Sequence, residues 1–402
     1  MSRKKIAVIG AGMAGSTLAY ALANDGFCDV QVFVSKDAEE IRKGRIPSTQ
    51  VHFHPVLERE QRYGMPDYGE AYGIDAIELL MGGQKMFKGR AARQSVTLDQ
   101  RIYLSALLEG LPGKGVQVRK ARLSPNDLPR LAEEFDLIVD ASGKIGPLGP
   151  FPVNRGISNA PSFPQRVCTA GLFHGIEPDE GHKMSYHILP GLGEMFELTT
   201  VTEHGPARSL LLEAVPGSEL DRIKGDKGPI TFIQEMKELL KAFFPSIYER
   251  VDEERFRLVD DQAYTRLAIQ PRFHLPYTSV NGTLVLGCGD SVALNDPITG
   301  QGANLASFCA EALFDTLKEF ADREWNVFLA ERYWDRIREM VVKVSEWTNA
   351  MMGPPSDSFA DLLVRASQSQ ETADELVNLF LNPIQAHEAF FGISRTELLR
   401  NI

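Results

Sequence analysis

Residues 5–15, KIAVIGAGMAG, decide the fold of this 402-residue chain. An apolar strand over residues 5–9 runs directly into a glycine-rich turn, and the Ala- and Leu-rich residues 16–24 that follow are typical of a helix. In such a turn the first glycine permits the tight bend, the second lets the backbone approach a pyrophosphate, and the third packs helix against strand. Because a helix N-terminus also offers unpaired N–H groups to phosphates, the pattern predicts a dinucleotide site. The expected contacts come from Gly10, Gly12, Met13, Ala14 and Gly15.

The acidic residue that usually follows the second strand of such a unit is missing. Residues 30–34 read as that strand, and Ser35 and Lys36 stand where an Asp or Glu that binds the adenosine ribose is expected. These contacts are therefore left to Ser35, Lys36 or Arg45. The substitution weakens any interpretation of the site as one tuned for NAD.

A second glycine-rich turn lies far downstream. Residues 283–287 read as a buried strand that ends in a Gly-Asp pair, and Asp296-Pro297 then leads into residues 300–304, GQGAN, at the start of another helix. The carboxylate can accept hydrogen bonds from ribityl hydroxyls, and the helix N-terminus can stabilise negative charge on N1 of a reduced flavin. A capped helix after a tight turn is the alternative without a ligand, but the two turns together favour FAD. The expected contacts here are Asp290, Pro297, Gly300, Gly302, Ala303 and Asn304.

The rest of the chain predicts α/β units at both ends with an antiparallel insert between them. Residues 35–73 look irregular, and everything beyond residue 324 reads as helical, broken by Gly353-Pro354-Pro355. Other expected elements are helices at 98–111, 230–248 and 302–320, a strand at 135–140 and antiparallel sheet at about 184–215.

We therefore expect an α/β fold in which a Rossmann-like FAD-binding domain carries an inserted antiparallel β-sheet substrate domain and a helical C-terminal region. The predicted boundaries are 1–170 and 272–322 for the FAD-binding domain, 171–271 (with strands from about 75–97) for the substrate domain, and 323–402 for the C-terminal region.

Composition limits the kinds of partner. A net charge of −11 argues against nucleic acid, and no run approaches the roughly 18 uncharged apolar residues of a membrane-spanning helix. The four cysteines are far apart and form no CxxC pair, so neither a disulfide framework nor a metal site is expected. The first residues imitate a secretory signal peptide, but the glycine spacing explains them better. We expect a cytoplasmic protein.

Several motifs together carry a family resemblance. The two glycine-rich turns, together with Asp140-Ala141-Ser142-Gly143, resemble the aromatic-hydroxylase fold of flavoprotein monooxygenases. The chain more closely resembles the styrene and indole monooxygenases, from its N-terminus to about residue 380. The further stretches that carry this resemblance are Leu98-Asp99-Gln100-Arg101, Gly171-Leu172-Phe173, Trp347-Thr348-Asn349 and Ser367-Gln368-Ser369.

The resemblance implies a two-component mechanism. In that family a separate NADH-dependent flavin reductase supplies FADH2, which reacts with O2 to give a C4a-hydroperoxyflavin that epoxidises an alkene or an indole double bond. The substrate is then a small apolar aromatic molecule: indole first, with styrenes and aryl sulfides accepted. This chain carries one dinucleotide fingerprint, and we find no second one for NADH. A homodimer is one option that the sequence leaves open.

The resemblance also implies particular site residues. Arg45, Arg101 and Gly143 match cofactor positions, and Ser48, Thr49, Gln50 and His52 match positions that face the isoalloxazine ring and the substrate cavity. Ser48, Gln50, Ile74 and Ile77 look like the indole branch, whereas His52 and Ser95 resemble the styrene branch.

Simpler interpretations stay open for several of these residues. Gln50, His52 and His54 alternate and could line one face of a strand, and no third ligand at metal spacing accompanies them. Ile74 and Ile77 have helical spacing and could be core. The competing functions are a single-component NAD(P)H-dependent aromatic hydroxylase, a dehydrogenase of the same fold and a non-catalytic flavin-binding protein.

Overall fold

The computed structural model describes residues 3–67, 73–179, 181–224 and 227–392. Its first layer is a six-stranded sheet in the order β15-β16-β7-β1-β2-β6, parallel except for the pair β15 and β16. The central strand places Ile6 beside Val30 on one side and Leu137 on the other. The strands are β1 (Lys5–Ile9), β2 (Asp29–Val34), β6 (Gln117–Lys120), β7 (Leu137–Asp140), β15 (Tyr277–Val280) and β16 (Thr283–Gly287).

Helices cover both faces of this sheet, which explains why its strands are almost continuously apolar. On one face, α1 (Met13–Asp25), α4 (Gln100–Gly110), α8 (Gly302–Glu319) and α9 (Val327–Met351) build the largest hydrophobic core. On the other face, α5 (Leu128–Glu134) packs Leu128 and Leu131 against Ile138 and Val285.

The second layer is a nine-stranded sheet in the order β12-β8-β11-β10-β9-β4-β5-β3, with β13 beside β8. The prediction of an antiparallel sheet is right for most pairs but wrong for one, because β4 and β9 run parallel. The reason is that β4 comes from a separate, earlier part of the chain and joins the edge of the β9–β11 meander. The strands are β3 (Val51–His52), β4 (Ile74–Met81), β5 (Gln84–Thr97), β8 (Val167–His174), β9 (Lys183–Leu189), β10 (Gly193–Thr202), β11 (Gly205–Ala214), β12 (Arg257–Leu258) and β13 (Tyr264–Ala268). A separate small pair joins β14 (Arg272–Phe273) to β17 (Ala293–Leu294).

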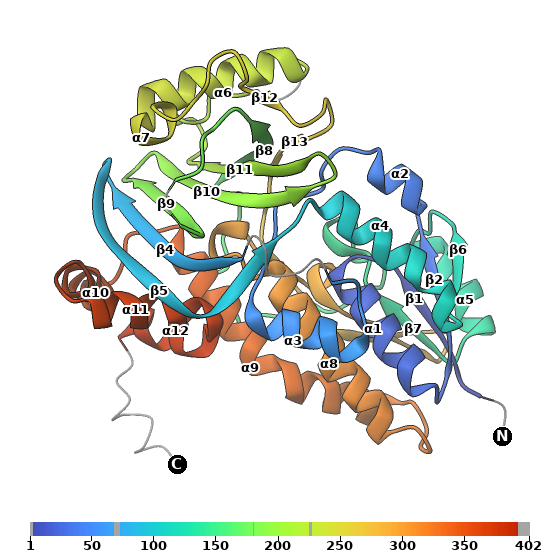
Figure 1. Cartoon of the computed structure of the whole chain (residues 1–402). Helices are drawn as coiled ribbons and strands as arrows, with labels where there is room; N and C mark the ends of the chain where they lie inside the picture. Colours follow the sequence, from blue (N-terminus) through green and yellow to red (C-terminus); the bar gives the residue numbers. More distant parts are fainter. Residues whose placement is uncertain (1–2, 68–72, 180, 225–226, 393–402) are drawn as a thin grey trace.

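Two groups of helices flank the large sheet (Figure 1). The helices α6 (Pro229–Phe243) and α7 (Pro245–Tyr248) cover one face and share a core with β8 and β11. At the other end of the sheet, α10 (Asp357–Gln368) and α11 (Gln370–Asn378) lie against β4 and β5, and α12 (Pro383–Phe391) packs on α9. The predicted combination of parallel sheet, second sheet and C-terminal helices is confirmed, whereas the residue boundaries of the domains stay a prediction.

The segment expected to be irregular, residues 35–73, contains regular structure where it is described. It forms α2 (Ala38–Arg42), β3 and α3 (His54–Tyr63). Because α3 starts at His54, this histidine does not continue the strand that carries His52. The helix buries Val56, Glu60 and Tyr63, which are spaced by four and three residues. Among the described residues, no helix is both long and apolar enough to span a bilayer.

Candidate functional site

A cavity of about 380 Å³ lies between the two sheets. The turn between β1 and α1 forms one part of its wall, and the segment between β16 and α8 forms another. The large sheet supplies an apolar wall that consists of Ala170, Leu172, Met184, Phe196, Leu198, Leu211 and Leu267. The predicted cofactor residues on the lining are Gly12, Met13, Ala14, Gly143, Asp290, Pro297, Gly300, Gly302 and Ala303.

The glycine-rich turn before α1 has the geometry that a dinucleotide requires. Gly10 has a φ of +104°, and an added Cβ would lie 2.3 Å from the carbonyl oxygen of Ala141. A Cβ on Gly15 would lie 2.0 Å from the carbonyl oxygen of Gly10, whereas one on Gly12 would meet no atom within 4 Å. Gly12 is also the N-cap of α1 and places no side chain over the N–H groups of the first turn. These residues therefore fit a phosphate group at the start of α1.

The start of α8 opens on the same cavity. Its N-cap, Gln301, makes no side-chain capping bond, and Gly300 adopts a φ of +65° in the turn before it. Asn304 fixes the opposite loop: its Nδ2 donates to the carbonyl oxygen of Val51 at 3.1 Å, and its Oδ1 accepts the N–H of Phe53 at 3.1 Å. Asn304 therefore holds the loop that carries Ser48, Thr49 and Gln50 against α8, and all three of these residues line the cavity.

Gln50 stands out within that loop. Its Oε1 is buried and has no hydrogen-bond partner among the described residues. An unpaired buried acceptor costs about 1–3 kcal/mol, which a ligand with an N–H or O–H group can recover. Gln50 therefore brings an unpaired amide oxygen to the lining beside the apolar wall; among the described lining residues, Asn295 Oδ1 and Asp296 Oδ2 are unpaired as well.

Asp290 faces the cavity from the short 3₁₀ helix η4 (Gly289–Ser291), which follows β16. Burial raises the pKa of its carboxyl from 3.8 to about 6, although the charge of Lys144 acts in the opposite direction. Because the folded-state pKa is raised, this group favours the folded state only while it is protonated. Between pH 3.8 and about 6 the folded protein binds more protons than the unfolded chain, so this contribution falls as the pH rises and is lost above about pH 6.

Asp290→Asn should therefore stabilise the flavin-free protein above about pH 6, by roughly 2 kcal/mol, because it removes a partly buried charge. At a pH below 3.8 the two proteins should have equal stability. Urea unfolding of both proteins across this pH range measures the effect. Equal stability above pH 6 would show that Asp290 is well solvated.

Four of the predicted substrate residues lie outside the cavity lining. Ile74 and Ile77 are on β4, a strand rather than a helix, and pack into the core that α10 and α11 cover. Ser95 is buried on β5 opposite Ile74. His52 is fully buried, with its Nδ1 2.8 Å from Glu60 Oε1. The sequence pattern could not show this, because the α3 helix that supplies Glu60 was not expected.

Ser35, Lys36 and Arg45, the residues that the missing acidic residue leaves to bind the adenosine ribose, do not line the cavity. Ser35 and Lys36 are exposed at the end of β2. Arg45 is exposed and lies over the ring of Tyr264, 4.3 Å from its centroid.

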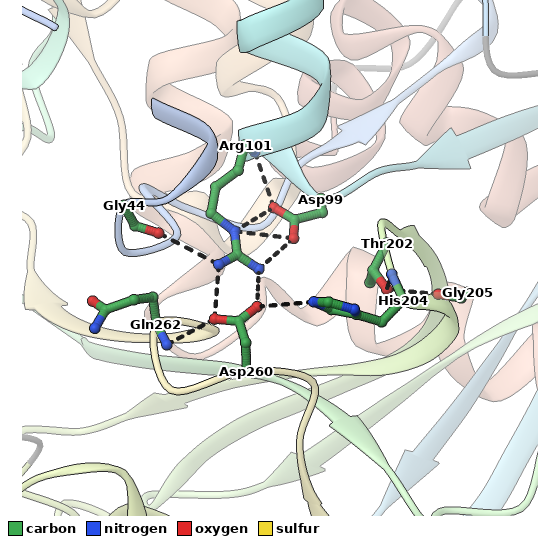
Figure 2. A network of polar contacts seen from close by, with 8 residues as sticks. All are labelled: Gly44, Asp99, Arg101, Thr202, His204, Gly205, Asp260 and Gln262. Atoms are coloured by element: carbon green, nitrogen blue, oxygen red, sulfur yellow. Dashed lines mark hydrogen bonds and ion pairs between the residues drawn. The ribbon is translucent and has the colours of Figure 1, made fainter. Parts of the chain in front are cut away.

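Arg101 lies between two carboxylates, as Figure 2 shows. Its Nε is 3.0 Å from Asp99 Oδ1, and its Nη1 and Nη2 lie 2.9 and 2.7 Å from the two oxygens of Asp260. Asp99 lines both the cavity between the sheets and a smaller, neighbouring cavity, which Arg101 and Asp260 also line. In this structure the guanidinium therefore joins α4 to the loop after β12.

Sequence reasoning predicts a β-sheet substrate domain but missed which residues of that sheet line the cavity. The lining residues Phe196, Leu198 and Thr200 alternate along β10, which is the period of a strand with one face toward a cavity. It also missed Cys168 and Asp296, both of which are buried on the lining. The Asp-Pro motif drew attention to Pro297, although Asp296 is the residue whose side chain organises the turn: its Oδ1 accepts the N–H of Ile298 at 3.1 Å.

Comparisons with known proteins agree with this site. Residues 143–250 match the family described as "Styrene monooxygenase A putative substrate binding domain". Styrene monooxygenase StyA from Pseudomonas sp is 30% identical over 405 residues, and StyA from Pseudomonas fluorescens is 29% identical over 406; both alignments cover 98% of this chain and 96% of the relative. The crystal structure of a flavoprotein/dehydrogenase from Cytophaga hutchinsonii has the same fold, with a TM-score of 0.69 at 14% identity, over 99% of this chain and 100% of that one.

The fold, the cavity and these relatives first define a class: the chain is a flavin-dependent monooxygenase, and a flavin is its cofactor. Within that class, the chain belongs to the styrene monooxygenase family. The predicted family is therefore confirmed, whereas its indole branch stays a prediction.

Proposed function

We propose that this protein is the oxygenase component of a two-component system that epoxidises indole and also accepts styrene-type alkenes and aryl sulfides. The unpaired Oε1 of Gln50 beside the apolar wall of the cavity carries this proposal. Indole has one N–H donor on an otherwise apolar bicyclic ring, so an amide oxygen in an apolar cavity complements it. Styrene has no such donor and would leave the amide oxygen unpaired.

The chain's own residues position the reactants and exclude water. Leu172, Phe196 and Leu198 offer an apolar surface to an aromatic ring. The open N-termini of α1 and α8 suit the phosphates and the ring of FAD, and Asp290 suits its ribityl hydroxyls. Reduced FAD supplies the electrons that activate O2. We propose that a separate NADH-dependent reductase provides it, because the sequence contains a single dinucleotide fingerprint.

Two assays test this proposal. Chemically reduced FAD, O2 and indole should give an oxygenated product that develops into indigo, and omission of FAD should abolish it. Without a reductase, NADH or NADPH should not bleach protein-bound FAD. Prompt bleaching would indicate a single-component hydroxylase. The absence of any oxygenated product, from styrene as well as indole, would indicate a non-catalytic flavin-binding protein.

Gln50→Val should lower the ratio of kcat/KM for indole to kcat/KM for styrene by about tenfold, because only indole loses a hydrogen bond. Competition assays with both substrates and reduced FAD give this ratio directly. Gln100→Val is a matched control: Gln100 is also buried with an unpaired Oε1, but it is absent from the cavity lining. The control should keep the wild-type ratio. An unchanged ratio in Gln50→Val would remove Gln50 from indole recognition.

A further inference from the structure

Two buried carboxyl groups face each other at the wall of the cavity. Glu213 lies on β11, and Asp296 lies immediately before the 3₁₀ helix η5 (Pro297–Thr299). One oxygen of each carboxyl group lies within 4.8 Å of the other and of the sulfur of Cys168. Both residues are essentially inaccessible to solvent, with exposures of 0% and 1%. A hydrogen bond between two carboxyl groups requires a proton on one of them.

Among the described residues, no positively charged side chain forms an ion pair with Glu213. On the neighbouring strand, Glu194 lies directly opposite Glu213 and takes the guanidinium of Arg166 through bonds of 2.7 and 2.9 Å. Arg166 also donates to the carbonyl oxygen of Met352. Cys168 is opposite Glu213 on β8, and Tyr186 is a further titratable group nearby. Burial and the nearby carboxyls raise the pKa of Glu213 well above its ordinary value.

Glu213 and Asp296 differ in the hydrogen-bond donors that reach their carboxyl oxygens. No N–H or O–H group of the described residues satisfies either oxygen of Glu213. Asp296, in contrast, accepts the backbone N–H of Ile298 through Oδ1, while its Oδ2 has no hydrogen-bond partner among the described residues. The negative charge is therefore better stabilised on Asp296, and the proton belongs on Glu213.

We propose that protonated Glu213 is a positioning residue: it donates a hydrogen bond to Asp296 and so holds the turn that carries Pro297 to Gly302 in the shape that binds the flavin. Asp296 is the link, because one oxygen accepts from Glu213 and the other caps η5. When Glu213 loses its proton, Glu213 and Asp296 are two adjacent negative charges beside this turn, and their repulsion drives the two carboxylates apart. This inference needs the flavin cofactor but not the indole specificity.

The same three side chains are close enough to hold a metal ion, but their chemistry favours the proton. Burial raises the pKa of the Cys168 thiol well above its usual value, so it does not readily supply the thiolate that a metal prefers. A shared proton satisfies the facing carboxyl oxygens without any additional group.

The test compares Glu213→Gln with Glu213→Leu. The glutamine amide donates a hydrogen bond at every pH, as the protonated acid does at neutral pH, whereas leucine cannot donate. In wild type, the dissociation constant of FAD should rise at least about tenfold from neutral to strongly alkaline pH. Glu213→Gln should keep the neutral-pH value within about threefold and show no such rise. Glu213→Leu should bind FAD about tenfold more weakly already at neutral pH.

Infrared difference spectroscopy supplies a second measurement on the same proteins. Wild type should show the carbonyl band of a protonated carboxylic acid, and Glu213→Gln should lack it. The proposal is overturned if this band is absent from wild type, if Glu213→Gln keeps the alkaline loss of affinity, or if it binds FAD at neutral pH as weakly as Glu213→Leu does. A stoichiometric metal ion in wild type that disappears in Glu213→Gln would also overturn it. Failure of indole turnover would leave these binding results unaffected.

Discussion

Gly15→Ala should lower the free energy of unfolding of the flavin-free protein by about 3 kcal/mol or more. The added Cβ would lie 2.0 Å from the carbonyl oxygen of Gly10 and 2.9 Å from its carbonyl carbon. Both contacts are with backbone atoms at the junction of β1 and α1, so no side chain can rotate away to relieve them. Relief requires α1 to shift away from β1, which opens the largest core of the protein. Urea unfolding followed by circular dichroism measures the loss.

Gly12→Ala is the matched control, because it makes the same chemical change three residues earlier. Its Cβ would meet no atom within 4 Å, and Gly12 has an ordinary φ of −74°. We expect the free energy of unfolding to stay within about 1 kcal/mol of wild type. The affinity for FAD should fall by about tenfold or more, because the methyl group occupies the space through which the backbone approaches a pyrophosphate. If both variants unfold equally easily, the two glycines do not have separate roles.

The local sequence determines some elements of this fold and leaves others open. The glycine-rich turns and their flanking strands could be predicted because each depends on neighbouring residues. The helix α3 could not be predicted because residues 35–73 contain Pro47, Pro55 and Pro66, which are typical of loops. In the structure Pro55 stands in the first turn of the helix, where proline is tolerated. The parallel pairing of β4 with β9 could not be predicted, since no local pattern specifies which distant strand a segment joins.

The candidate site likewise contains residues that the sequence could predict and residues that it could not. Segments 48–50 and 290–303 lie on one cavity, and each could be found from a short motif or from the family resemblance. The pairs Glu213–Asp296 and Arg101–Asp260 could not be found, because their members are distant in sequence and meet only when the two sheets pack. Ile74 and Ile77 pack in a core that α10 and α11 cover, so a role for them in substrate binding stays a prediction from the family resemblance.

Arg101→Met should cost the flavin-free protein about 3–5 kcal/mol of its free energy of unfolding. Methionine keeps much of the side-chain volume but removes the guanidinium, which lies between Asp99 and Asp260 (Figure 2). The side chain of Asp99 is only 2% exposed, and the hydrogen bond that it would keep is the one from the backbone N–H of residue 101. A buried carboxylate without its counter-ion is among the most costly defects in a folded protein.

Arg42→Met is the control for this prediction, because Arg42 lines the same small cavity but pairs with Glu109 at the surface. Loss of that exposed pair should cost about 1 kcal/mol or less. Urea unfolding without FAD separates a structural role from cofactor binding, since a residue that acts only on the cofactor cannot change the stability of the flavin-free protein. If Arg101→Met keeps wild-type stability without FAD and loses only affinity for FAD, the guanidinium turns toward the cofactor when FAD binds. A large loss without FAD instead makes Arg101 the ion-pair link between α4 and the loop after β12.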